Sequence, residues 1–138
     1  MSIPMTWPDT VEALFEYLNG TEHAGRQIQL IEEKPVTGPH DREVGLDEVT
    51  VVVTLDDSAI GDIDRVDKFR FEVYADDRKT ARDVAESIVA LLTVPGGWES
   101  PSALIDDAEH RSGPASVPHP SEHVRRFDFR VWLTTRPM

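Results

Sequence analysis

The chain has 138 residues, a formal net charge of −12 and no cysteine, which excludes a disulfide framework, thiolate catalysis and Cys-ligated zinc. Its 39% hydrophobic and 29% charged residues are typical of a soluble globular protein, and its length predicts one domain spanning residues 1–138. No apolar run approaches the roughly 20 residues that cross a bilayer, and residues 1–9 lack the regions of a secretory signal, so we expect a cytosolic protein.

The first predicted element is a helix that begins at a capping box, Thr6-Trp7-Pro8-Asp9. Thr6 is the predicted N-cap, and Asp9 is predicted to reach back toward it. The helix ends at Asn19-Gly20. Its apolar stripe at helical spacing consists of Val11, Leu14, Phe15 and Leu18.

Four segments of different character follow this helix. Residues 26–31 alternate as a short strand, whereas 32–48 contain prolines and glycines and predict an open loop or a loose hairpin. Residues 49–55 are rich in β-branched side chains and predict a central strand. Residues 56–68 are mostly polar and acidic, so they predict a long hairpin loop.

The clearest pattern lies between residues 69 and 92. Residues 69–75 alternate between apolar and polar side chains, as in a strand with one buried face. Asp76 or Asp77 is then expected to cap a helix, which Pro95-Gly96-Gly97 ends. The apolar positions of this helix are Ala81, Val84, Ala85, Ile88, Leu91 and Leu92.

The C-terminal part predicts two strands separated by turns. Residues 103–110 form a weak strand pattern, 112–125 are turn-like because they contain three prolines, and 126–134 predict a closing strand. Its inward-facing residues are Phe127, Phe129, Val131 and Leu133. Trp132 faces the other way, and either lies with Arg130 on an uncovered sheet face suited to protein contacts or folds over a sheet edge.

These elements predict an α+β fold in the order α-β-β-β-α-β-β. The expected architecture is a mixed, mainly antiparallel sheet of four to five strands with two helices packed on one face.

Charge is distributed unevenly along the chain. Residues 1–110 contain 9 Lys and Arg against 24 Asp and Glu, whereas residues 111–138 contain 5 against 2. A mostly acidic surface disfavours tight binding of nucleic acid. The charge either serves solubility alone or lets the basic segment of one copy pair with an acidic face of another.

Three patterns resemble reactive sites, and each is incomplete. Residues 56–67 fit a calcium-binding loop except that Ile60 occupies a position that should supply oxygen. His110, His119 and His123 match no rigid metal-binding spacing. Paired aspartates such as Asp56-Asp57 point apart when they are neighbours in a strand or turn. We therefore predict no catalytic, cofactor-binding or metal-binding residue and no enzymatic activity.

Three motifs together resemble the tail terminator proteins of long-tailed phages, especially those of actinobacterial hosts. They are the helix W-P-D followed by V-E-A-L-F-E-Y-L, the strand F-R-F-E-V-Y-A followed by T-A-R-D-V-A-E-S-I-V-A-L-L, and the closing strand R-F-D-F-R-V-W-L-T-T-R-P. The resemblance covers nearly the whole chain in element order. It implies a structural virion protein that forms a ring, commonly of six subunits. This ring would terminate the tail tube and join it to the head-completion or stopper protein, with no cofactor and with DNA passing through the bore without specific binding.

The resemblance also implies that long loops and hairpins reach neighbouring subunits or the major tail tube protein. A ring contact joins two different patches of each subunit, and we expect these to be an acidic loop and the basic C-terminal segment. The expected interface residues are Asp62, Asp64, Asp67, Arg125, Arg126, Arg130 and Trp132. Two alternatives remain: another head–tail connector or neck protein of the virion, or a small α+β enzyme or ligand-binding domain with a deep polar pocket.

Overall fold

The computed structural model describes residues 7–32, 48–61, 63–120 and 123–137. Most of the loop predicted at 32–48 lies outside the described residues, as do Thr6 and Asp62. The elements are, in chain order, α1 (Thr10–Leu18), β1 (Glu22–His23), β2 (Arg26–Ile31), β3 (Glu48–Ile60), β4 (Arg65–Ala75), α2 (Arg78–Leu92), β5 (Trp98–Ser100), β6 (Ala103–Ile105), β7 (Asp107–Val117) and β8 (Arg125–Thr135).

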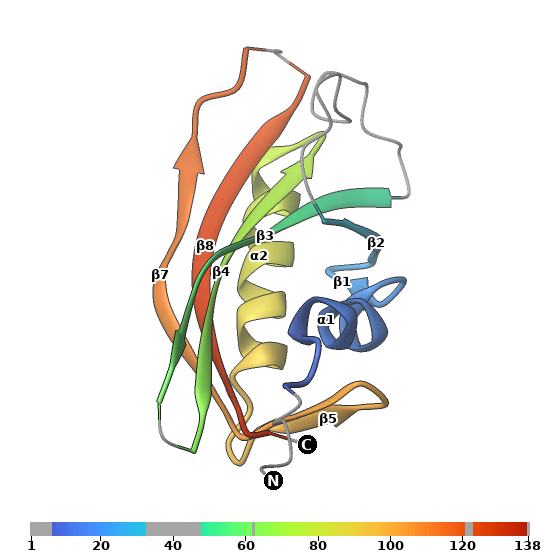
Figure 1. Cartoon of the computed structure of the whole chain (residues 1–138). Helices are drawn as coiled ribbons and strands as arrows, with labels where there is room; N and C mark the ends of the chain where they lie inside the picture. The colour runs from blue at the N-terminus through green and yellow to red at the C-terminus, as the bar shows by residue number, and fades with distance from the viewer. Residues whose placement is uncertain (1–6, 33–47, 62, 121–122, 138) are drawn as a thin grey trace, which may run out of the picture.

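The described residues form an α+β fold built on one curled sheet (Figure 1). Six strands lie in the order β1-β2-β3-β4-β8-β7, and β5 and β6 form a separate two-stranded hairpin. The neighbours β2 and β3 are parallel, whereas the other paired strands are antiparallel. The predicted class and mixed pairing are confirmed, but the predicted count of four to five strands was too low.

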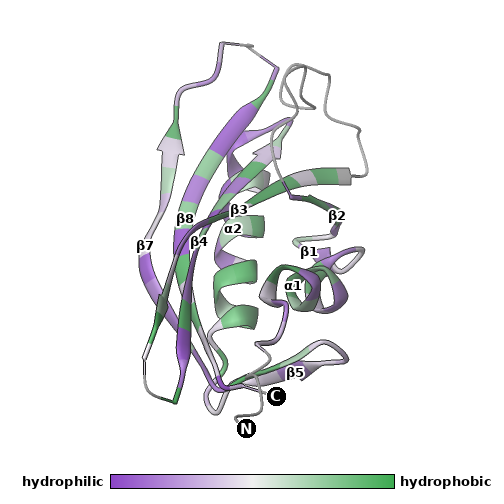
Figure 2. Cartoon of the chain, viewed as in Figure 1, coloured by the Kyte–Doolittle hydropathy of each residue, from purple (hydrophilic) through white to green (hydrophobic). Residues whose placement is uncertain are grey.

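Both helices lie on the same side of the sheet, as predicted (Figure 1). Their apolar sides and one sheet face share a single core. Figure 2 shows the corresponding alternation of hydrophobic and hydrophilic bands along β8. The four inward-facing residues predicted for this strand are buried: Phe127, Phe129, Val131 and Leu133. Phe129 stacks on Phe71 of β4, with ring centroids 4.7 Å apart, so the aromatic contact joins the two central strands.

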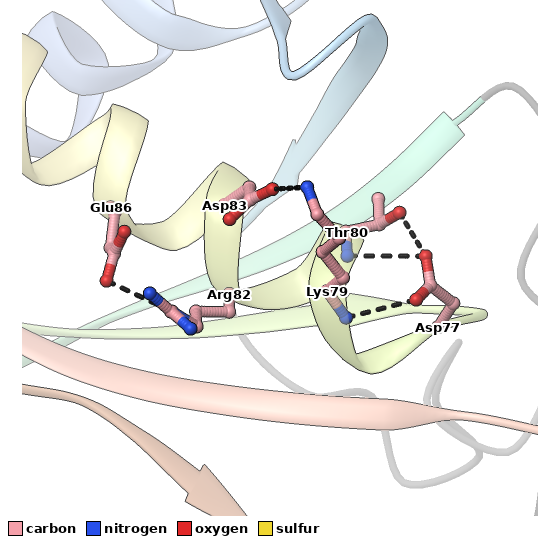
Figure 3. Close-up of polar contacts among 6 residues, drawn as sticks. All are labelled: Asp77, Lys79, Thr80, Arg82, Asp83 and Glu86. Carbon is pink, nitrogen blue, oxygen red and sulfur yellow. Dashed lines mark hydrogen bonds and ion pairs between the residues drawn. The ribbon is translucent and has the colours of Figure 1, made fainter.

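The second helix begins at Asp77, one of the two residues expected to cap it. The Asp77 carboxylate accepts hydrogen bonds from the backbone N–H groups of Lys79 and Thr80 and from the Thr80 hydroxyl (Figure 3). These bonds, the Thr80 hydroxyl first, lower the pKa of the Asp77 carboxyl group. Exposed ion pairs at i and i+4, Lys79–Asp83 and Arg82–Glu86, follow along the solvent side (Figure 3).

The first helix begins later than predicted. Its N-cap is Asp9, which accepts from the backbone N–H of Glu12, so the assignment of Thr6 as the cap was wrong. The β5–β6 hairpin holds the other side of α1, because Tyr17 stacks on Trp98 at a centroid distance of 4.0 Å. Trp98 also donates its indole N–H to the carbonyl of Leu92 at the end of α2, and thereby connects both helices.

Two segments predicted as loops are strands. The acidic segment 56–68 was expected to form a long hairpin loop, but β3 continues to Ile60 and β4 begins at Arg65. A register shift between Leu55 and Asp57 accommodates the extra residue of β3. The segment 112–125 was expected to be turn-like, but β7 continues to Val117 and pairs with β8 across two register shifts. Strand pairing to a long neighbour overrode weak local patterns in both cases.

Candidate functional site

The sheet face opposite the helices, here called the helix-free face, carries the polar residues of β4 and β8 that form the candidate binding site. Alternate positions of β4 and β8 point to this face because the residues between them are buried in the helix-covered core. On β4 and β8 its residues are Lys68, Arg70, Glu72 and Tyr74, and Arg126, Asp128, Arg130 and Trp132. Of the two placements left open for Trp132, the structure has the one with Arg130 on the uncovered face.

Trp132 lies between two cations. Lys68 on β4 places its ammonium 4.4 Å from the centre of the Trp132 ring, and Arg111 on β7 places its guanidinium carbon 4.1 Å from it. These distances are typical of cation–π contacts. Because β4 and β7 flank β8 on its two sides, the indole is held between neighbouring strands instead of folding over a sheet edge.

The next row along the strands contains two arginines. Arg70 of β4 lies directly opposite Arg130 of β8, and Ser112 of β7 lies opposite Arg130 on the other side. This row borders a pocket of about 220 Å³. A pocket of about 340 Å³ lies elsewhere, beside Pro8 and Leu104. Like charges directly opposite each other destabilise a strand pair, and the Asp56 carboxylate, 3.8 Å from Arg70, offsets this repulsion on the Arg70 side.

The next two rows, Glu72 opposite Asp128 and Tyr74 opposite Arg126, contain a half-buried ionic cluster. Arg126 makes two hydrogen bonds of 2.7 Å to the Asp128 carboxylate and an ion pair of 2.6 Å to Glu72. The hydrogen bonds that Arg126 donates to the Asp128 carboxylate are the main reason that the pKa of Arg126 is raised. Tyr74 donates to Glu72, and burial is the main reason that the pKa of its phenol is raised. These ion pairs and hydrogen bonds connect β4 to β8.

The predicted interface residues do not form two compact patches. Asp67 was expected in an exposed acidic loop, but it is fully buried on the helix-covered side of β4. Asp64 lies in the β3–β4 turn, where its carbonyl accepts from the Gly61 N–H, and Asp62 lies outside the described residues. Arg125 is exposed at the start of β8, and only Arg126, Arg130 and Trp132 share one face.

Asp67 anchors the first helix to the β3–β4 hairpin. Its carboxylate accepts from the hydroxyl groups of Thr10 at 2.6 Å and Ser58 at 2.5 Å, and from the guanidinium of Arg65 at 3.0 Å. Arg65 also donates to the carbonyl of Pro8 at 2.7 Å. Asp67 therefore connects three segments and is not available to a partner.

The outer part of the β3–β4 hairpin exposes three large apolar side chains. The exposed fraction is 43% for Leu55, 63% for Ile60 and 69% for Ile63. Among the described residues, these are three of the four exposed large hydrophobic side chains, and Leu104 is the other. Such side chains gathered on one element are a feature of surfaces that bind other proteins.

Sequence reasoning missed Lys68, Arg70 and Arg111 as members of the site. Lys68 and Arg70 lie an even number of residues before Tyr74, so in a strand that begins at Arg65 they point to the same face as Tyr74. The alternation would have identified them if the strand had been predicted to begin there. Arg111 had no such signal, because it falls between the weak strand pattern at 103–110 and the segment 112–125, which was expected to be turn-like.

The histidines provide no metal centre in the described part of the chain. No group of three or more His, Cys, Asp or Glu side chains there could hold a metal ion. His119 instead packs edge-on against Tyr74, with ring centroids 5.9 Å apart. His23 is buried between Thr21 and Ser87. Its contact to a serine hydroxyl lacks the third, acidic partner of a catalytic triad.

No helix among the described residues has both the length and the apolar character needed to cross a membrane. In comparisons with protein-family models and with curated proteins, the chain matches none of them.

Proposed function

We propose that this chain is a tail terminator of long-tailed phages, a non-enzymatic virion protein that forms a ring, of six subunits in this proposal. The ring would cap the major tail tube protein at the head-proximal end of the tail and join the head-completion protein. Its assembly would take place in the host cytoplasm. The three motifs given above motivate this role.

The observation that supports the proposal best is the β3–β4 hairpin. It extends past the helices (Figure 1) and exposes Ile60 and Ile63 near its end. Leu55, opposite Phe69, is exposed farther back on the same hairpin. A projecting hairpin with apolar side chains is suited to contact a neighbouring subunit or the tube. The helix-free face, with Arg130 and Trp132, offers a second and chemically different patch, as a heterologous ring contact requires.

A binding role also fits the charge of the molecule. A net charge of −12 weakens attraction to the phosphates of DNA, so a ring of such subunits would let DNA pass without holding it. Residues Arg125, Arg126 and Arg130 are proposed to act in protein contacts, and Asp64 is the one described acidic residue of the proposed loop that remains near its tip.

Light scattering and negative-stain microscopy of the purified chain test this function, alone and with the tail tube protein encoded in the same genome. We expect closed rings, alone or on tube ends, and tubes of limited length. A protein that neither caps tubes nor changes their length contradicts the terminator role. Binding to the head-completion protein alone, without the tube, would favour another head–tail connector.

A further inference from the structure

We propose that Arg70, Arg130 and Ser112 form a binding site for a single carboxylate group, that of one Asp or Glu side chain in an otherwise uncharged segment of a partner protein. The site, here called the arginine row, lies on the helix-free face where β4, β8 and β7 run side by side. This inference goes beyond the proposed function, because the site would bind the carboxylate of a partner whether or not the chain is a tail terminator.

The two arginines of the row have few acceptors for their donor groups. Arg130 is exposed and has no hydrogen bond or ion pair to any described residue. Arg70 reaches one carboxylate oxygen, that of Asp56, at 3.8 Å, which is too long for a hydrogen bond. The Nε–H of Arg70 is buried and has no hydrogen-bond acceptor among the described residues. The two guanidinium groups therefore retain donors for a ligand.

The surface beside the two arginines is concave. Arg70, Arg130 and Ser112 line the pocket of about 220 Å³, together with Gly113, Ala115, Asp128 and Phe129. The pocket lies at the register shift between Ser112 and Ala115. Gly113 is required there, because a Cβ atom on it would lie 2.3 Å from the carbonyl oxygen of Asp128. The backbone of β7 thus approaches β8 closely beside the two arginines.

The acidic residues around the row determine which kind of anion can bind. The row has acidic residues on both sides: Asp57 and Glu109 in the row of Trp132, and Glu72 and Asp128 in the ionic cluster. A nucleic acid strand would place its successive phosphates near these carboxylates, which would repel them. The faces of Trp132 are also approached by Lys68 and Arg111, so the indole is not an open platform for stacking bases.

A single carboxylate meets fewer of these acidic residues than successive phosphates do, because Asp128 is the one described acidic residue that lines the pocket. The bound carboxylate would lie between the two guanidinium groups, accept charge-assisted hydrogen bonds from both, and remove the repulsion between them. The Asp128 carboxylate does not fill this role, because both of its oxygens already accept from Arg126. The partner segment would carry one Asp or Glu with uncharged neighbours.

The test uses the full chain with ¹⁵N-labelled arginine and follows the Nε–H resonances by NMR. The probe is a blocked Gly-Ser peptide with one central glutamate, and the comparison ligands are its glutamine counterpart, inorganic phosphate and an oligothymidine. We expect saturable shifts of the Arg70 and Arg130 resonances with the glutamate peptide, at about millimolar affinity, and none with the glutamine peptide.

Substitutions locate the binding on the row. Arg130→Gln and Arg70→Gln should each weaken the affinity for the glutamate peptide about tenfold or more. Arg82→Gln, which removes an exposed charge on α2, should leave it unchanged. Equal weakening by all three variants, or no saturable shift at all, overturns the proposal. Tighter binding of phosphate overturns it in favour of an inorganic anion, and tighter binding of oligothymidine in favour of nucleic acid. None of these results depends on ring formation, so they are separate from the test of the terminator role.

Discussion

At the scale of single residues, Asp67 has the greatest predicted effect on stability. It is a buried carboxylate with three side-chain donors from α1, β3 and β4. Removing the charge of a buried, hydrogen-bonded ion pair leaves its partners unsatisfied, so Asp67→Asn should lower the free energy of unfolding by about 3 kcal/mol. Chemical denaturation measures this loss.

The matched control for Asp67 is Asp57 on the same hairpin. Its side chain is 66% exposed and lies 3.7 Å from Lys68. Exposed ion pairs contribute little, so Asp57→Asn should change the free energy of unfolding by less than about 1 kcal/mol. Similar losses in the two variants would show that Asp67 does not have the anchoring role described here.

His23 makes stability depend on pH. The Thr21 hydroxyl donates to the carbonyl of Leu18 at 2.6 Å, so its oxygen accepts from Nε2–H of His23 at 2.8 Å. Nδ1 then carries no proton and accepts from the hydroxyl of Ser87 at 2.7 Å. This arrangement holds the neutral ring, and burial lowers the pKa of His23 below its ordinary value of 6.5.

Because the unfolded chain binds a proton at His23 more readily than the folded chain, stability is full above pH 6.5 and falls as the pH drops below it. The His23→Gln variant should lose this part of the pH dependence. Unfolding is measured between about pH 7.5 and about pH 5, a range that includes the ordinary pKa of histidine. His110→Gln, at an exposed histidine of β7, should keep it. The same pH profile in wild type and His23→Gln would contradict the assignment.

At the scale of elements, β7 depends on Gly113. This residue has φ +78°, and an added Cβ would lie 2.3 Å from the carbonyl oxygen of Asp128. Gly113→Ala therefore combines left-handed backbone strain with a backbone clash, and we expect it to lower the free energy of unfolding by more than about 2 kcal/mol. Thermal or chemical denaturation measures the change.

Gly96 is the control for that prediction, because it has φ +85° but no atom within 4 Å of an added Cβ. Gly96→Ala should show the backbone strain alone, about 1–2 kcal/mol. If Gly113→Ala were no worse than Gly96→Ala, the close approach of β7 to β8 would not hold in solution, and the pocket beside the arginine row would be different.

The elements also show why part of the fold followed from the sequence. The helix at 78–92 and the alternation of β8 were predicted with nearly correct ends, because each has a strong local period and clear end signals. The outer halves of β3, β4 and β7 lack this signal. They are strands because each pairs with a long neighbour, which no local pattern encodes.

At the scale of the whole molecule, the hairpin end should act in assembly and not in folding. Ile60 and Ile63 are 63% and 69% exposed, so the double substitution Ile60→Ser and Ile63→Ser should change the free energy of unfolding by less than about 1 kcal/mol. Under the proposed function it should reduce ring formation or tube capping strongly, because apolar contact area is lost.

Light scattering and electron microscopy, with and without the tail tube protein, measure that effect. Leu104→Ser, at a similarly exposed leucine of β6, is the matched control and should assemble as wild type does. Unchanged assembly by the hairpin variant would remove the hairpin from the interface while leaving the terminator role open to its own test.

By itself, the sequence determined the two helices, the buried side of the central strands and the position of Trp132 opposite that side, because all three follow from periods within one segment. Only the tertiary structure decided that Asp67 is an internal anchor and that Arg70 faces Arg130. These outcomes depend on the register between strands that are distant in the chain, and a shift of one residue would move every side chain to the other face. The physical reason for the division is that side-chain direction is a local property, whereas the identity of a neighbour is set by the pairing of whole elements.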